Sequence, residues 1–135
     1  MPPSLQREIE IILIRRWASY VKLPLFLIAP EGDVVYYNDS AAVLLGRPFD
    51  ESGPMSAEEL AVIFRTATEG GREPLPADSL PAVRAWRTRR PAYGRIQYHA
   101  LDGKNWDIEV CAMPLIGLGE RYLGVLVAFW EVQPA

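Results

Sequence analysis

The sequence predicts an α+β domain built on one antiparallel sheet. An apolar helical stretch opens the chain, two short apolar segments around a Pro-Gly turn follow it, and the last third alternates between apolar and polar residues. Alternation with a period of two is typical of strands, and tight turns join antiparallel neighbours. The order is one helix, two strands, three short helices and three strands, which predicts a five-stranded sheet with the short helices on one face.

Size and charge narrow the classes of function. The chain has 135 residues, enough for one domain with a real core, and a net charge of -3 without a long run of one sign. Because phosphate binding requires clustered Lys and Arg, we expect no nucleic-acid partner. The single cysteine, Cys111, allows no intrachain disulfide. No apolar run reaches the ~20 residues of a membrane span and no signal peptide is visible, so we expect a cytoplasmic protein without a membrane partner.

Residues 1–22 are predicted to form an N-terminal amphipathic helix, and residues 23–135 the domain proper. One face carries apolar residues at steps of three and four, namely Ile9, Ile12, Leu13, Trp17 and Tyr20. Ile11 and Ile14 lie outside that stripe, so the apolar belt is wider than a single surface requires. Two alternatives stay open: the helix packs on its own domain only, or it meets a partner chain as well.

The next segment combines a hairpin with a short helix. Residues 25–29 and 34–38 are short and apolar, and the Pro and Gly between them indicate a tight turn. Asn38, Asp39 or Ser40 is placed to cap a helix that ends at Gly46.

Two further helices are expected in the middle of the chain. Ser56 begins a capping box and predicts a helix over residues 57–67. Asp78 or Ser79 is placed to cap a second helix over residues 78–90, with a proline in its first turn.

The closing strands define two faces of the predicted sheet. Ile108 and Val110 alternate with Asp107 and Glu109, so the apolar pair faces inward and the carboxylates face outward. The last strand, residues 121–132, is apolar on both faces, as expected when both sides are covered. The outer face therefore needs a cover, and the N-terminal helix is the spare element. It covers its own sheet, that of a partner, or both.

The ordered set of segments resembles the PAS domain family over about residues 23–132. Its opening mark is "LFLIAPEGDVVYYNDSAAVLLG", and its closing mark is "LDGKNWDIEVCAMPLIGLGERYLGVLVAFWEV", in which Pro114 and Gly124 stand where the family usually has them. The segment "PLPADSLPAVRAWRTRRP" is similar to the long helix that walls the PAS pocket. The resemblance implies a sensory module whose sheet and short helices enclose a small cavity.

Two departures from the family pattern bear on the partners. Ala29 stands where many PAS domains carry an Asp, and the Asp-Ile-Thr that commonly couples them to an effector is missing from the closing segment. We therefore expect a stand-alone module whose signalling effector is a separate protein.

The residues do not identify a cofactor. Flavin-binding relatives carry a reactive Cys in an Asn-Cys-Arg motif on a mid-chain helix, whereas Cys111 lies on a strand and is expected to be a structural thiol. Haem-binding relatives usually place a His on the long helix, whereas His99 lies on a strand and faces outward. We expect no metal site, because His99 has no companion ligands nearby. The cofactor stays unknown.

Two groups of residues are the candidate functional sites. The tentative ligand pocket consists of Phe26, Ile28, Val34, Tyr36, Leu44, Trp86, Tyr98, Ile108 and Val110. The tentative dimer interface consists of Ile9, Ile12, Leu13, Trp17, Tyr20 and Met113. A fully packed interior is the alternative to a pocket, because the same side chains fill a core equally well.

We therefore expect a sensory or regulatory PAS module, not an enzyme. It forms a homodimer, binds a small molecule in an apolar pocket and relays a signal to its effector. A small α+β cavity enzyme of the isomerase or dehydratase kind is one alternative, and it requires Asp107 and Glu109 to point into the cavity. A dimerisation scaffold without any ligand is the other.

Overall fold

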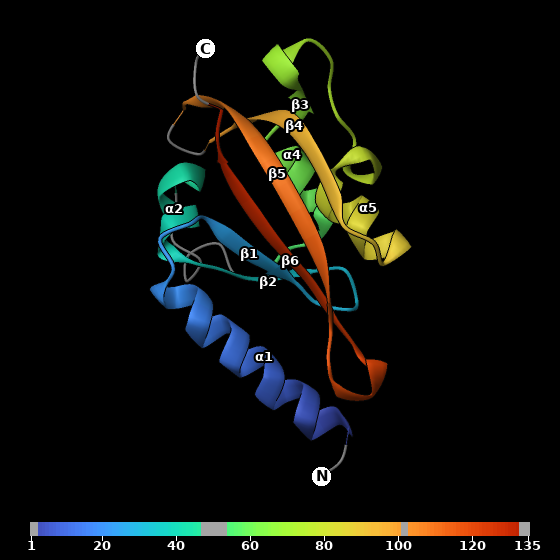
Figure 1. Cartoon of the computed structure of the whole chain (residues 1–135). Helices are drawn as coiled ribbons and strands as arrows, with labels where there is room; N and C mark the ends of the chain where they lie inside the picture. Colours follow the sequence, from blue (N-terminus) through green and yellow to red (C-terminus); the bar gives the residue numbers. More distant parts are fainter. Residues whose placement is uncertain (1–2, 47–53, 101–102, 133–135) are drawn as a thin grey trace.

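A computed structural model describes residues 3–46, 54–100 and 103–132 of the chain (Figure 1). One antiparallel sheet has the strand order β2-β1-β6-β5-β4-β3. The strands are β1 Leu25–Ile28, β2 Val34–Tyr37, β3 Ala67–Thr68, β4 Ala92–His99, β5 Asn105–Ile116 and β6 Tyr122–Glu131. The helices are α1 Pro3–Tyr20, α2 Asp39–Leu45, α4 Ala57–Ile63 and α5 Pro81–Thr88. The predicted α+β class is confirmed.

The sheet has one strand more than the five predicted. The additional strand, β3, has two residues and pairs with Ile96 and Gln97 of β4 at the edge of the sheet. Two residues are too few to show an alternation, so the sequence carries no signal for this strand.

The two early strands form the expected hairpin around Gly32. The N–H of Gly32 donates to the carbonyl of Ala29, and Gly32 has a φ of 101°, a conformation that favours glycine. A register shift between Leu27 and Ile28 marks a bulge in the pairing with β2. Strands β4 and β5 form a second hairpin, and their pairing extends as far as His99 and Asn105. Asp102 of the "DGKN" turn between them lies outside the described residues.

Both mid-chain helices are shorter than predicted. Helix α4 ends at Ile63 rather than at residue 67, and Arg65 just beyond it takes a left-handed φ of 45°. Helix α5 begins at Pro81, because a residue before proline is pushed out of the helical region and Leu80 has an extended ψ of 138°. Neither Asp78 nor Ser79 is therefore its cap. Both belong to a separate 3-10 turn, Ala77–Ser79.

Asn38 joins three elements at one buried point. Its Oδ1 accepts from the N–H of Leu25 and, as the N-cap of α2, from the N–H of Ala41, both at 3.0 Å. Its Nδ2 donates to the carbonyls of Ala18, Val21 and Leu23 at 2.9–3.2 Å. Of the three capping candidates, Asn38 is the residue that caps α2, and it also holds the end of α1 against the start of β1.

Helix α1 lies across the outer face of the sheet, away from α4 and α5 (Figure 1). Near its middle, α1 is held by an ion pair between Glu10 and Arg121, which precedes β6. Further along the helix, the guanidinium of Arg15 lies 4.8 Å from the ring centre of Tyr36 on β2. The helix thus covers its own sheet. No helix among the described residues is long and apolar enough to cross a bilayer.

Candidate functional site

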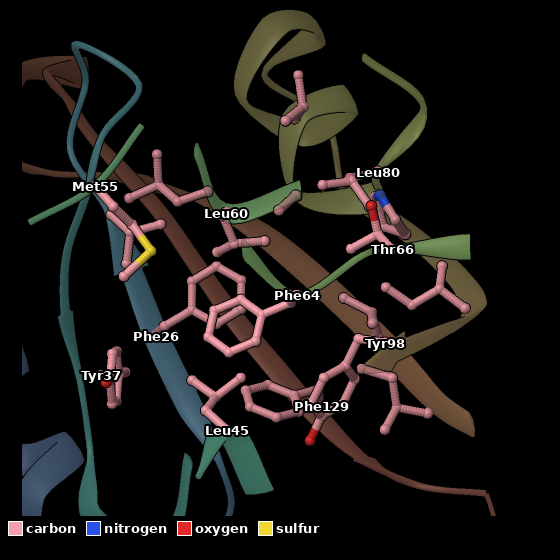
Figure 2. A pocket seen from close by; sticks show the side chains of 18 residues that line it. Phe26, Tyr37, Leu45, Met55, Leu60, Phe64, Thr66, Leu80, Tyr98 and Phe129 are labelled. Atoms are coloured by element: carbon pink, nitrogen blue, oxygen red, sulfur yellow. The ribbon is translucent and has the colours of Figure 1, made fainter. Parts of the chain in front are cut away.

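An apolar cavity of about 60 Å³ lies between the inner face of the sheet and the short helices (Figure 2). Six of the nine predicted pocket residues line it: Phe26, Ile28, Val34, Tyr98, Ile108 and Val110. The other lining residues are Tyr37, Leu45, Met55, Leu60, Phe64, Thr66, Leu80, Pro81, Ala82, Val83, Ile96 and Phe129. The cavity therefore draws on the sheet and on all three short helices. That a ligand occupies it stays a prediction.

Tyr36 and Leu44 do not line the cavity, which corrects their predicted placement. In both cases the next residue along the chain does so instead. The bulge in the β1–β2 pairing and the stacking on Arg15 place Tyr36 on the outer face, and Tyr37 is turned inward. On α2, the side chain of Leu45 reaches the cavity, whereas Leu44 contributes its carbonyl to the hydroxyl of Tyr98 at 2.6 Å.

Trp86 is the third predicted pocket residue that lies elsewhere. Its indole N–H donates to the carbonyl of Pro30 at 2.8 Å, and its ring packs on the hairpin turn. A Cβ placed on Gly32 would lie 2.9 Å from this ring. Helix α5 starts three residues later than predicted, and Pro81, Ala82 and Val83 of its first turn face the cavity.

Trp86 also takes part in a second, half-buried hydrogen bond near the end of α5. The hydroxyl of Tyr122 donates to the carbonyl of Trp86 at 3.1 Å, and the guanidinium of Arg89 lies 4.5 Å from the Tyr122 ring centre. Burial raises the pKa of Tyr122 above its ordinary value of 10.0, and the positive charge of Arg89 opposes part of that rise.

Aromatic rings form much of the cavity wall. Phe26 and Phe129 lie with ring centres 5.8 Å apart and tilted by 57°, and Phe64 meets Tyr98 edge to face at 6.1 Å. Figure 2 shows these four rings gathered in the middle of the lining. An empty cavity of this size costs roughly 1.4 kcal/mol, so the core carries a measurable defect when nothing fills it.

Several lining residues gave no usable signal in the sequence. Phe64 follows Leu60 by four residues, and this helical spacing is the one pattern that points both toward the same side. Phe129 lies on β6, where both faces are apolar, so its direction becomes visible only from its pairing with Val110. Met55 lies on a loop, for which periodicity predicts nothing.

The outer face carries the polar residues that an enzyme of this fold would need inside. Asp107 accepts from the N–H of Gly70 at 3.1 Å, and Glu109 pairs with Arg95 at 2.9 Å. His99 lies on the same face, with Nδ1 2.8 Å from Oδ1 of Asn105. The cavity-enzyme alternative requires Asp107 and Glu109 to point into the cavity, and this orientation is wrong. The described residues hold no group of three His, Cys, Asp or Glu side chains suited to a metal ion.

The exposed side of α1 is apolar. All five predicted interface residues of the helix are exposed, with Ile12 at 58% and Leu13 at 60%, and Met113 on the outer sheet face is exposed as well. Ile11 and Ile14 are half-buried and Ala18 is buried, so these three mark the side that faces the sheet. Cys111, next to Met113 on the same strand, is half-buried.

Solved structures with a similar fold identify the architecture. The PAS domain of BvgS from Bordetella pertussis superposes with a TM-score of 0.60 at 13% identity, over 93% of this chain and 87% of that one. The chain has the PAS fold. A Rhodobacter sphaeroides LOV protein gives a TM-score of 0.68 at 12% identity, over 92% and 68%. Neither a family model nor a curated protein matches the sequence, so the PAS likeness is one of structure.

A third similar structure is the PAS domain of nitrogen regulation protein NR(II) from Vibrio parahaemolyticus, with a TM-score of 0.59 at 11% identity. It covers 89% of this chain and 98% of that one. The PAS fold thus extends over almost the whole chain.

Proposed function

We propose that this protein is a non-enzymatic, cytoplasmic sensory module that binds a small molecule in the cavity and forms a homodimer through α1. Residues 1–22 serve as the dimerisation segment, and residues 23–135 as the sensory domain. The proposal rests on the alternation of side chains along strand β1. Phe26 and Ile28 line the cavity, whereas Leu25 and Leu27 point to the opposite side, where α1 lies. Leu25 and Leu27 are 2% and 1% exposed.

This arrangement supports a relay across one layer of strand. A ligand that fills the cavity changes the packing of Phe26 and Ile28, and the neighbouring side chains on the other face move with the same backbone. Protein interiors are close-packed, so such a shift alters the fit of α1 on the sheet. A ligand that binds one fit better than the other shifts their populations, which is the signal we propose for a separate effector protein.

The exposed apolar stripe supports dimerisation. Soluble monomers seldom leave a contiguous stripe of large apolar side chains in water, and a second copy of the same helix offers a self-complementary cover. Structures with the same fold include a PAS domain from a two-component sensor histidine kinase, which is a signalling protein by name. The cavity favours this function over that of a scaffold without a ligand, because a scaffold gains nothing from unfilled space in its core.

The double substitution Ile12→Asp and Leu13→Asp tests the interface. We expect sedimentation velocity to show a dimer for the unchanged chain and a monomer for the double variant. The matched control is Val43→Asp with Val62→Asp, because both valines are similarly exposed, at 74% and 76%, but lie on α2 and α4. The control should stay dimeric. A double variant of α1 that remains a dimer would overturn the proposal.

A further inference from the structure

We infer that the cavity selects an uncharged, hydrocarbon-like ligand about the size of one aromatic ring. The inference deepens the proposed sensory function and rests on it, because it names the ligand class of the same site. It follows from three properties of the lining: its satisfied polar atoms, its lack of charge and its size.

Two of the three hydroxyl groups of the lining donate to carbonyl groups inside the protein. Thr66 donates its hydroxyl to the carbonyl of Leu75 at 2.8 Å, and Tyr98 donates its hydroxyl to the carbonyl of Leu44 at 2.6 Å. The described residues contain one buried side-chain donor without an acceptor, Nε1 of Trp106, and Trp106 does not line the cavity. A site built for a polar ligand leaves unpaired groups when it is empty, because those groups are reserved for the ligand.

The described lining contains no Lys, Arg, His, Asp or Glu. A carboxylate or an ammonium group that entered the cavity would lose its hydration without gaining an ionic partner, and an unpaired buried charge is strongly disfavoured. The nearest ionisable residues along β5, Asp107 and Glu109, lie on the other side of the sheet and have their own partners. The lining therefore discriminates against charged metabolites of any size.

The volume sets the size of the ligand. A cavity needs about 10–15 Å³ to hold one water molecule, so 60 Å³ corresponds to roughly four to six such units. This is the scale of a short branched alkane or, where the side chains of the lining yield, of a single six-membered ring, because an engineered cavity that binds benzene has about 150 Å³. Apolar cavities stay dry and accept molecules such as benzene, because a water molecule inside them finds no hydrogen bonds. The edge-to-face rings of Phe64 and Tyr98 offer an aromatic ligand both edges and faces.

The test compares benzene with benzoate, two probes that share a ring and differ in charge. We expect benzene to shift the methyl NMR signals of Ile96, Ile108 and Val110 in a saturable manner in the full chain. Benzoate should bind at least about tenfold more weakly, because its carboxylate loses hydration without a partner. Equal binding of the two probes, or no saturable shift with benzene, would overturn the inference.

A matched pair of variants places the binding in the cavity. Val83→Phe fills the lining from α5, whereas Val62→Phe makes the same change on the exposed side of α4. We expect Val83→Phe to weaken benzene binding at least about tenfold, since the added ring occupies the space, and Val62→Phe to leave it unchanged. If Val83→Phe does not fold, Ala82→Leu fills the cavity from the next position. Unchanged benzene binding in a folded filling variant contradicts the assignment.

The interface variant separates the ligand class from the proposed function. If the Ile12→Asp, Leu13→Asp chain binds benzene normally and yet stays a dimer, the ligand class stands and the proposed interface falls. If the unchanged chain is an α1-dependent dimer but ignores benzene, the interface stands and the ligand class falls.

Discussion

Around β1 and β6 the two faces of the sheet are both apolar, and each is covered in a different way. The inner face is covered by α2, α4 and α5, and this cover leaves space that no side chain fills. On the outer face Leu25 and Leu27 are buried, but the cover of that face, α1, exposes its own apolar side chains to solvent. In the proposed function, a small molecule fills the inner face and a second copy of α1 covers the outer one.

In the proposed function, one layer of strands thus serves two kinds of binding, that of a small molecule and that of a second chain. Alternate residues of β1 and β6 belong to opposite faces, so each strand is part of both sites at once. A change that damages the shared strands should therefore affect both faces, and a change at one face should first affect that face. The following variants test this expectation in order of decreasing effect.

Gly124→Ala should damage both faces together. Gly124 lies on β6 with a φ of 122°, and a Cβ there would lie 2.0 Å from the backbone carbonyl oxygen of Ile28. The clash forces β1 away from β6, and we expect a loss of about 4 kcal/mol in the free energy of unfolding, measured in urea.

The control for this variant is Gly119→Ala. Gly119 also has a positive φ, 71°, but no described atom lies within 4 Å of a Cβ placed there. Only the backbone strain remains, which costs about 1 kcal/mol. If both variants lose the same stability, the close approach of β1 and β6 is not what requires glycine at position 124.

Asn38→Ala should loosen the outer face more than the inner one. The substitution removes the donor shared by three carbonyls at the end of α1, together with the cap of α2. We expect a loss of about 2–3 kcal/mol and faster amide exchange throughout α1, since its end is no longer held. Asp39→Ala, one residue further on, is the control and should cost no more than about 0.5 kcal/mol. Slow exchange in α1 of the Asn38→Ala variant would show that other contacts hold the helix.

Tyr122→Phe tests the inner side through the pH dependence of the free energy of unfolding. Because the pKa of Tyr122 is raised in the folded state, the unfolded chain loses its proton first as the pH rises above 10.0. The folded state then binds more protons than the unfolded state, so stability falls with increasing pH in that range. Tyr122→Phe should show a smaller decrease in the urea midpoint between about pH 9 and 11. An identical decrease in both proteins would exclude Tyr122 as its source.

The sequence was most informative where the alternation was strict. In β5, Ile108 and Val110 are buried while Asp107 and Glu109 face outward, as predicted from their period of two. The cap of α2 and the hairpin turns were also readable, because short polar residues and glycine have few other uses there. These local patterns suffice to establish the fold.

The details of the cavity depend on contacts that no local pattern encodes. The run "VVYY" is apolar or aromatic at every position, so a bulge within this strand, between Val34 and Tyr36, decides that Tyr37, not Tyr36, faces inward. The sequence predicts Pro81 in the first turn of a longer helix, but the steric effect of this proline on Leu80 delays the start of α5 to Pro81. Trp86, one turn further along α5, packs against the hairpin turn and does not line the cavity.

The two attachments of α1 differ in their chemistry. Asn38 is buried, so salt scarcely weakens its hydrogen bonds, whereas Glu10 and Arg121 keep about a fifth of their side-chain surface in water. Raising the ionic strength should therefore weaken the contact between Glu10 and Arg121 more than the hydrogen bonds of Asn38. The position of the amino-terminal half of α1 on the sheet is then expected to depend on the salt concentration, whereas that of its carboxyl-terminal end is not.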